Sequence, residues 1–241
     1  RLGISIDLKE LNRLSDETPV LINLKPTGSG YMEDLYNAGG VTRIIYELRK
    51  QLHLDCTDIT GKTLEQKLVN SQKENFDQSI IYSFSDPVNK KGGLISLFGS
   101  LAPEGAILKR AAATKSLLEH QGRAVVFSSL EDLANRVDEP NLDVKESDIL
   151  ILQNSGPSSN SGMPEAGYLP IPKKLLAKGV KDMIRISDAR MSGTAFGTII
   201  LHVTPESNKK GPLAIVRNGD IIKLSEKNKS LDILISKEEL L

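Results

Sequence analysis

Hydrophobic residues in the first third of the chain recur every three or four positions, which is the spacing of one helix face. Leu8, Leu11 and Leu14 begin this pattern behind Asp7, a residue type that caps helix starts. Polar and glycine-rich stretches separate the periodic segments, and one apolar run is short enough to be a buried strand. The pattern therefore predicts helices over residues 8–14, 31–38 and 41–52 and after Thr63, with a strand over 19–24.

Beyond a polar segment at 70–77, the pattern changes to short apolar runs separated by turns. Two helical stretches, 130–137 and 173–178, interrupt these runs. Near the end, Asn218-Gly219 is the preferred pair for a type I′ hairpin, and a second turn follows at 227–230. Many short strands around few helices favour a barrel-like or sandwich-like second domain. The predicted strands are 79–84, 94–98, 106–109, 123–127, 148–153, 183–186, 212–217, 220–224 and 231–235.

Composition and charge exclude several classes of protein. Of 241 residues, 39% are hydrophobic and 26% are charged, as in packed globular domains. Lysine plus arginine and aspartate plus glutamate are 31 each, so the net charge gives no reason to expect a nucleic-acid partner. No apolar run of about 18 residues predicts a membrane span. The start of the chain has no signal-peptide pattern, which favours a cytoplasmic location and leaves a mitochondrial one open.

Cysteine and histidine are too sparse for a complete soft-metal site in this chain. Cys56 is the single cysteine, and the histidines are far apart. Cys56 is expected to be a small buried hydrophobe, and His202 to make a hydrogen bond in the core. A hard ion such as Mg²⁺, held by carboxylates and substrate oxygens, stays open.

Three loops rich in glycine and small polar residues are candidates for chemistry. Lys25 opens the loop 25–30, where a cation and glycine amides could bind a carboxylate or phosphate, although an ordinary loop before a helix is the commoner case. Glu165 ends the loop after the strand at 148–153 and is either a Mg²⁺ ligand or a solvated side chain. Ser192 precedes a glycine after the strand at 183–186. A serine acts as a base only beside a cation, a metal or a helix N-terminus, and most loop serines are structural.

Taken in order, six segments resemble the family of dihydroxy-acid, phosphogluconate and sugar-acid dehydratases. The SDARMSGTAFGT and LHVTPE sequences and the PIPKKL run are similar to the sugar-acid branch. The segments are LKPTGSGYMEDLYNAGG (24–40), LDCTDITGKTL (54–64), GSLAPEGAILK (99–109), GMPEAGYLPIPKKL (162–175), SDARMSGTAFGTIILHVTPE (187–206) and GPLAIVRNGD (211–220).

The resemblance implies an α/β fold in two parts. Residues 1–75 would be the incomplete C-terminal part of an α/β domain, and residues 76–241 a β-barrel-like domain with a few helices. It also implies cofactors: Mg²⁺ and an iron–sulfur cluster, of the 2Fe-2S kind, whose cysteine ligands lie outside this chain. Cys56 does not match a cluster-binding motif. In the complete enzyme, a dimer or tetramer of identical subunits is expected.

The resemblance further implies site residues and a reaction. Ser192 matches the base that removes the C2 proton of an aldonate, and Glu165 matches a Mg²⁺ ligand. Water then leaves from C3 and a 2-keto-3-deoxy acid results. Lys25, Arg190 and Thr194 are expected to orient the sugar acid. We expect a C-terminal fragment of a hydro-lyase that is inactive alone. The alternatives are a dihydroxy-acid dehydratase of branched-chain amino-acid synthesis and a non-catalytic binding or assembly module.

Overall fold

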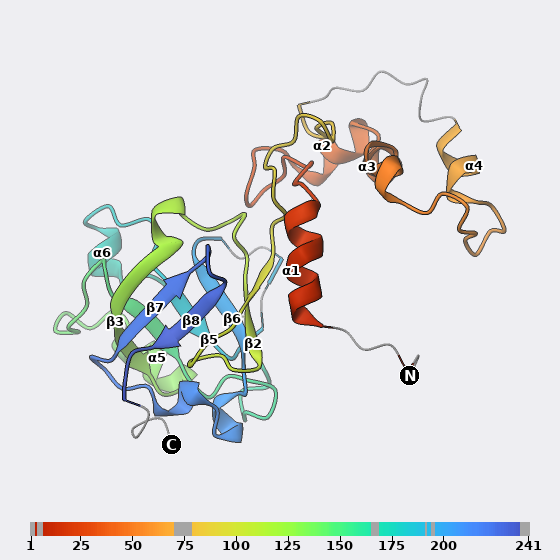
Figure 1. Cartoon of the computed structure of the whole chain (residues 1–241). Coiled ribbons are helices and arrows are strands. Elements are labelled where there is room, and N and C mark those ends of the chain that lie inside the picture. Colours follow the sequence, from red (N-terminus) through yellow and green to blue (C-terminus); the bar gives the residue numbers. More distant parts are fainter. Residues whose placement is uncertain are drawn as a thin grey trace. The chain divides into compact units, whose positions relative to one another are not determined.

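The computed structural model describes residues 3, 7–69, 79–164, 169–190, 192–193 and 196–236. The chain forms two compact units, coloured along the sequence in Figure 1. We call residues 1–14 and 93–241 the barrel unit, and residues 15–92 the helical unit. The boundary predicted at 70–77 lies outside the described residues and stays a prediction.

The helices predicted from periodicity in the first third of the chain are confirmed, with shifted ends. In α4, Thr63 is the N-cap, as expected. Its hydroxyl accepts a hydrogen bond from the Gln66 amide, and the Gln66 side chain accepts one from the Thr63 amide. The elements are α1 (Leu8–Glu17), α2 (Met32–Asn37), α3 (Gly40–Leu48), the 3₁₀ turn η1 (Arg49–Gln51) and α4 (Leu64–Leu68). Residues 8–14 of α1 belong to the barrel unit and residues 15–17 to the helical unit.

The strands predicted at 19–24 and 79–84 are wrong as regular strands. The two runs meet each other through an isolated bridge, Ile22 to Ile81, instead of a continuous ladder. Ile80 and Ile81 are buried because they pack against Leu35 and Ala38 in a small core. In the run 19–24 only Leu21 is buried, and Ile22 and Leu24 are partly buried against the same small core.

Eight strands form the sheet of the barrel unit, in the order β1-β2-β6-β5-β4-β3-β7-β8. A bridge between Phe98, after β1, and Ser230, in β8, joins the two edges, so the sheet is barrel-like. This confirms the expected fold class of α/β content with a barrel-like, β-rich part (Figure 1). The strands are β1 (Ile95–Leu97), β2 (Gly105–Leu108), β3 (Glu119–Phe127), β4 (Ile149–Leu152), β5 (Arg185–Ser187), β6 (Ile199–Thr204), β7 (Ile221–Ser225) and β8 (Ser230–Ile233).

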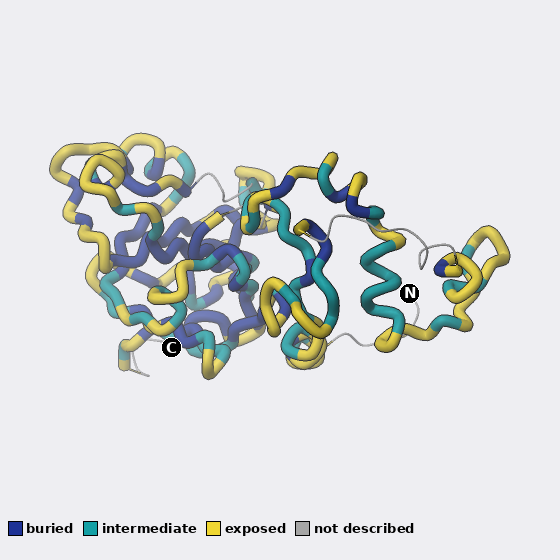
Figure 2. The backbone as a smooth tube through the Cα atoms, turned by 90° about the horizontal axis from the view of Figure 1, so that it is seen from above, coloured by how far each residue is buried: buried dark blue, intermediate teal, exposed yellow. Residues whose placement is uncertain are grey.

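Strands β3, β4, β5 and β6 are parallel neighbours, and every residue of β4 and β5 is buried. Figure 2 shows buried backbone concentrated in the barrel unit. Along β4, Ile149 and Ile151 belong to the large core cluster of the barrel unit. Leu150 alternates with them and packs in a second cluster that includes Leu133 of α5 (Leu130–Arg136) and Leu175 of α6 (Lys173–Leu176). Burial on both faces explains why β4 is a continuous apolar run.

The strand predicted at 212–217 is wrong. Residues Pro212–Ile215 form a 3₁₀ helix, η6, after Gly211. The buried Gln153 amide donates to the carbonyls of Leu213 and Val216, at 2.7 and 3.0 Å, and fixes this compact turn. The second predicted turn, by contrast, joins β7 and β8 as an antiparallel hairpin.

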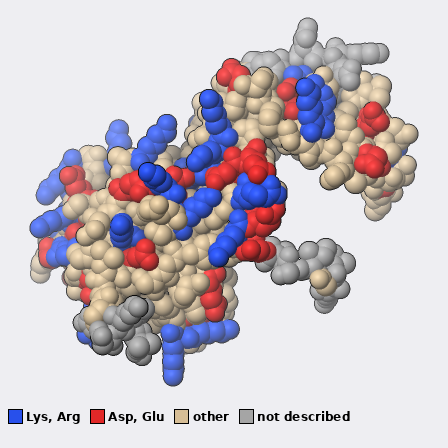
Figure 3. All heavy atoms as spheres, in the orientation of Figure 1, with Lys and Arg blue, Asp and Glu red and all other residues tan. Residues whose placement is uncertain are grey.

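Basic and acidic side chains alternate over the face of the barrel unit shown in Figure 3. This mixture fits the equal numbers of acidic and basic residues in the sequence. None of the helices in the described ranges is long and apolar enough to cross a membrane.

Candidate active site

The carboxyl ends of β4, β5 and β6 lie at one edge of the sheet, because these strands run parallel. The candidate loops therefore start side by side. The loop toward Glu165 follows β4, the loop with Ser192 follows β5, and the segment Pro205–Ser207 follows β6. Strand-end loops of parallel sheets commonly carry binding and catalytic groups.

Asp188 joins these three segments. Its side chain is 1% exposed, and its two carboxylate oxygens accept hydrogen bonds from the amides of Ser155 (2.9 Å) and Ser207 (2.8 Å). A buried carboxylate is stable only where donors replace its hydration. Here one acidic side chain from β5 fixes the starts of the loops after β4 and β6.

Glu206 fixes the same loop three residues further on. It accepts hydrogen bonds from the Ser158 amide (2.8 Å) and hydroxyl (2.6 Å). Burial raises the pKa of Glu206, but the Ser158 hydrogen bonds and the charge of Lys209 outweigh it and hold the pKa below its usual value. At Gly156, a Cβ atom would lie 2.3 Å from Glu206 Oε2, so the loop needs glycine there.

Ser192 is buried and lies in the connection between β5 and β6. Ala189 packs against Ile199 and Leu201, on the strand face opposite the barrel core. The Lys109 ammonium, just after β2, donates a 2.7 Å hydrogen bond to the carbonyl of Gly193, the residue next to Ser192. Ser192 itself is only 8% exposed, whereas the neighbouring Gly193 is exposed.

Arg190 lies close enough to His202, in β6, for its charge to act on the imidazole. Strand β6 bulges at His202, which has a φ of 55°, and the register with β2 shifts there. Burial lowers the pKa of His202, and the charge of Arg190 lowers it further. The structure thus places the charge of Arg190 close to His202 of β6, and its role toward a substrate stays a prediction.

A buried ion pair holds the far end of the serine loop. Arg185 contacts Asp182 at 3.1 Å and donates to the Phe196 carbonyl at 3.0 Å. Asp182 also accepts hydrogen bonds from the Thr198 amide and hydroxyl. The sequence pattern did not single out this pair, Lys109, Asp188 or Glu206. For Asp182 and Arg185, the sequence does contain a signal: two opposite charges stand in the otherwise apolar segment DMIRI (182–186).

Glu165 and Thr194 lie outside the described residues, and their roles stay predictions. Lys25 is in the helical unit, where its ammonium hydrogen-bonds the Tyr31 hydroxyl. The amides of Gly28 and Gly30 donate to carbonyls within the same loop. These two amides are therefore already used, and Lys25 is the group in this loop that favours an anion.

Cys56 is exposed, so the expectation of a buried hydrophobe is wrong. It lies in a turn, and its amide donates to the His53 carbonyl. Within the described ranges, no group of three or more His, Cys, Asp or Glu side chains could hold a metal ion. The residues at hand therefore do not by themselves fit either an iron–sulfur cluster or a complete Mg²⁺ site.

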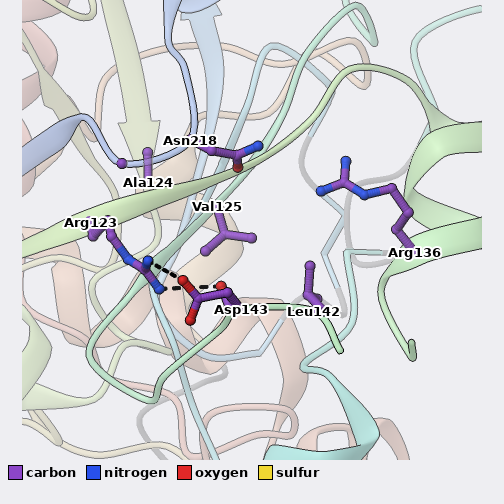
Figure 4. Close-up of a pocket in the computed structure, with 8 residues that line it drawn as sticks. Arg123, Ala124, Val125, Arg136, Leu142, Asp143 and Asn218 are labelled. Atoms are coloured by element: carbon purple, nitrogen blue, oxygen red, sulfur yellow. Dashed lines mark hydrogen bonds and ion pairs between the residues drawn. The ribbon is translucent and has the colours of Figure 1, made fainter. Parts of the chain in front are cut away.

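A pocket of about 230 Å³ elsewhere in the barrel unit includes none of the predicted site residues (Figure 4). Arg123 on its wall pairs with Asp143 at 2.5 Å and with Asp148 at 2.8 Å. Arg136, on the opposite wall, pairs with Asp132. Because carboxylates already neutralise these arginines, an anionic ligand gains little there.

Comparisons with known proteins match the whole chain to one family. The C-terminal model of the dihydroxy-acid/6-phosphogluconate dehydratases matches residues 79–241, and the N-terminal model matches residues 1–67. An L-arabinonate dehydratase of Rhizobium leguminosarum bv. trifolii is 41% identical over 242 residues. A 6-deoxy-6-sulfo-D-gluconate dehydratase of Pseudomonas putida is 43% identical over 243 residues, and a dihydroxy-acid dehydratase of Carboxydothermus hydrogenoformans is 38% identical over 241.

These alignments cover 99–100% of this chain but only 42% of each relative. The chain thus spans less than half the length of the proteins it matches. The C-terminal family model alone covers more than half of the chain, and the segments 99–109 and 187–206 that suggested the resemblance lie within it. The chain belongs to the dihydroxy-acid/6-phosphogluconate dehydratase family.

Proposed function

We propose that this chain is the C-terminal part of a dehydratase that converts an aldonate to a 2-keto-3-deoxy acid. The single observation that carries the proposal is the shielded Ser192, whose neighbour Gly193 is held by the Lys109 ammonium. A serine base needs such a cation nearby. Relatives named for sugar acids are 41–43% identical, whereas those named dihydroxy-acid dehydratase are 35–38% identical.

In this proposal the Ser192 alkoxide accepts the proton from C2 of the substrate, and the C2–H electron pair passes into the carboxylate as an enediolate. Hydroxide leaves from C3 and takes the proton from the Ser192 hydroxyl, so water is released and the alkoxide is regenerated. The enol then tautomerises to the keto acid. Arg190, next to the loop, is placed to pair with the carboxylate, while Lys25 and Thr194 orient the polyol chain. Asp188 and Glu206 act on the Glu165 loop by fixing its first residues.

The cofactors belong to the proposal as well. Glu165 would contribute one oxygen ligand to Mg²⁺, and the ligands of an iron–sulfur cluster would come from residues outside this chain. When bound, these groups supply Lewis-acid stabilisation of the enediolate and of the departing hydroxyl. The described residues supply the base, the cations and the loop anchors.

The test is water elimination by the protein made from the complete reading frame, loaded with iron, sulfide and Mg²⁺. Formation of keto acid from L-arabinonate and other aldonates is measured with semicarbazide. Ser192→Ala should lower kcat by about 10³-fold, because general bases contribute roughly 10²–10⁴-fold. Ser161→Ala, an exposed serine of the neighbouring loop, should leave kcat unchanged. A Ser192→Ala enzyme with the kcat of the wild type would contradict the assignment of Ser192 as the base.

The 241-residue chain alone should not turn over aldonates under the same conditions, since it offers no complete metal site among its described residues. Turnover by this chain would show that it is catalytically complete, contrary to the proposal. Preference for a branched dihydroxy acid over every aldonate would favour the dihydroxy-acid dehydratase instead.

The 42% span also fits a binding or assembly module. Co-purification with a separate N-terminal chain, without turnover, would support that alternative. The mass of the purified complex measured by light scattering would test the expected dimer or tetramer.

A further inference from the structure

Lys109 occupies an unusual position for a strand-end lysine. The register pairs Leu108 of β2 with Ile200 of β6, so Lys109 continues β2 beside the start of β6. Lysines at such positions usually extend their ammonium into solvent. Lys109 is instead half-buried, and its Nζ donates to the Gly193 carbonyl of a loop that is distant in sequence.

The Lys109 ammonium is partly removed from water, at a cost in free energy. Burial lowers the pKa of Lys109, which shows that the charged form is partly desolvated. The Gly193 carbonyl compensates part of that loss. A partly desolvated charge acts more strongly than a fully hydrated one on negative charge that develops nearby.

We propose that Lys109 is a positioning residue of the serine site, which fixes the Ser192–Gly193 turn and supplies the positive charge that favours a Ser192 alkoxide. This inference rests on the proposed role of Ser192 as the base. Lys109 stays protonated throughout. The alkoxide takes the C2 proton, so the C2–H bond breaks and an O–H bond forms, while the lysine transfers no proton.

Three substitutions separate charge from positioning. Lys109→Arg keeps both the charge and a donor. Lys109→Gln keeps a donor without the charge, and Lys109→Met removes both. Lys115→Met is the matched control, because Lys115 is an exposed lysine of the same segment. Each variant is prepared both as the complete enzyme and as the 241-residue chain.

In the complete enzyme, kcat with L-arabinonate should fall about 100-fold in Lys109→Gln and Lys109→Met, the size seen when one electrostatic stabiliser of a transition state is lost. Lys109→Arg should restore most of kcat, and KM should change by less than about threefold in all variants. A Lys109→Gln enzyme with wild-type kcat overturns the charge role.

Hydrogen exchange in the 241-residue chain tests positioning without any substrate. Amides around Ser192 and Gly193 should exchange about tenfold faster in Lys109→Met than in the wild type or Lys115→Met, because the hydrogen bond to Gly193 is lost. Lys109→Gln should retain slow exchange. Unchanged exchange in Lys109→Met overturns the positioning role. If the wild-type complete enzyme dehydrates no aldonate, the proposed function fails, while the exchange data still decide the role of Lys109 in the turn.

Discussion

The carboxylate of Asp188, at the end of β5, accepts a 2.9 Å hydrogen bond from the amide of Ser155, which opens the loop after β4. The first residue lies four positions before Ser192, and the second begins the segment that leads to Glu165. The proposed base and the proposed metal ligand are therefore carried by loops that share one buried anchor. Any shift of one loop start is transmitted to the other.

Asp188→Asn should destabilise the barrel unit by about 2 kcal/mol, because an amide offers one acceptor oxygen where the carboxylate offers two. The amide nitrogen would face a backbone N–H at either Ser155 or Ser207 and leave that donor unpaired. Urea unfolding measures the loss. Glu139→Gln, which alters an exposed carboxylate, should change the free energy of unfolding by less than about 0.5 kcal/mol. Equal stability of the two variants would contradict this role of Asp188.

Gly156→Ala should also lower stability, for a steric reason. The new methyl group would lie 2.3 Å from Glu206 Oε2 and 2.9 Å from Glu206 Cβ, so the loop or Glu206 must move. Overpacking of this kind costs about 1–3 kcal/mol, measured as a lower midpoint of thermal unfolding. Gly193→Ala is the control, since a Cβ at Gly193 meets no described atom within 4 Å. Unfolding midpoints that fall equally in both variants would argue against the steric explanation.

Much of the fold could be predicted because the signals were local. Thr63 is followed three residues later by Gln66, and a capping box forms as that spacing indicates. The prediction of a strand at 212–217 was wrong because the conformation of this segment depends on Gln153, about sixty residues earlier. The Gln153 side chain donates hydrogen bonds to two carbonyls of the segment. No pattern within the segment itself contains that information.

The site was predicted only in part for the same reason. Ser192 and Arg190 belong to one continuous motif, so their proximity follows from the sequence. Lys109 reaches Gly193 only because β2 and β6 pair in the sheet, a long-range contact that depends on the register. Nothing in the local sequence around Asp188 and Glu206 indicates that tertiary structure makes them anchors.

Arg185→Met should be among the most destabilising single changes in the barrel unit. It leaves Asp182 buried without its cation and frees the Phe196 carbonyl at the end of the serine loop. Removing one partner of a buried pair costs about 3–5 kcal/mol. The double variant Asp182→Asn/Arg185→Met should recover part of this loss in urea unfolding, because no unpaired charge stays buried. A double variant less stable than the sum of the single changes would contradict the pairing argument.

His202 should make stability depend on pH. Burial and the charge of Arg190 lower its pKa in the folded state, so the unfolded chain binds a proton more readily. Stability due to neutral His202 is present above the unfolded value of about 6.5 and is lost as the pH falls through the lower folded value. His202→Asn removes the titration and tolerates the φ of 55° at the bulge, since asparagine adopts left-handed conformations. Unfolding of the wild type and this variant is compared from about pH 7.5 to pH 5, with His53→Asn as the exposed control. The wild type should lose more stability than His202→Asn over this range, whereas a constant difference between them would show that His202 does not titrate with folding.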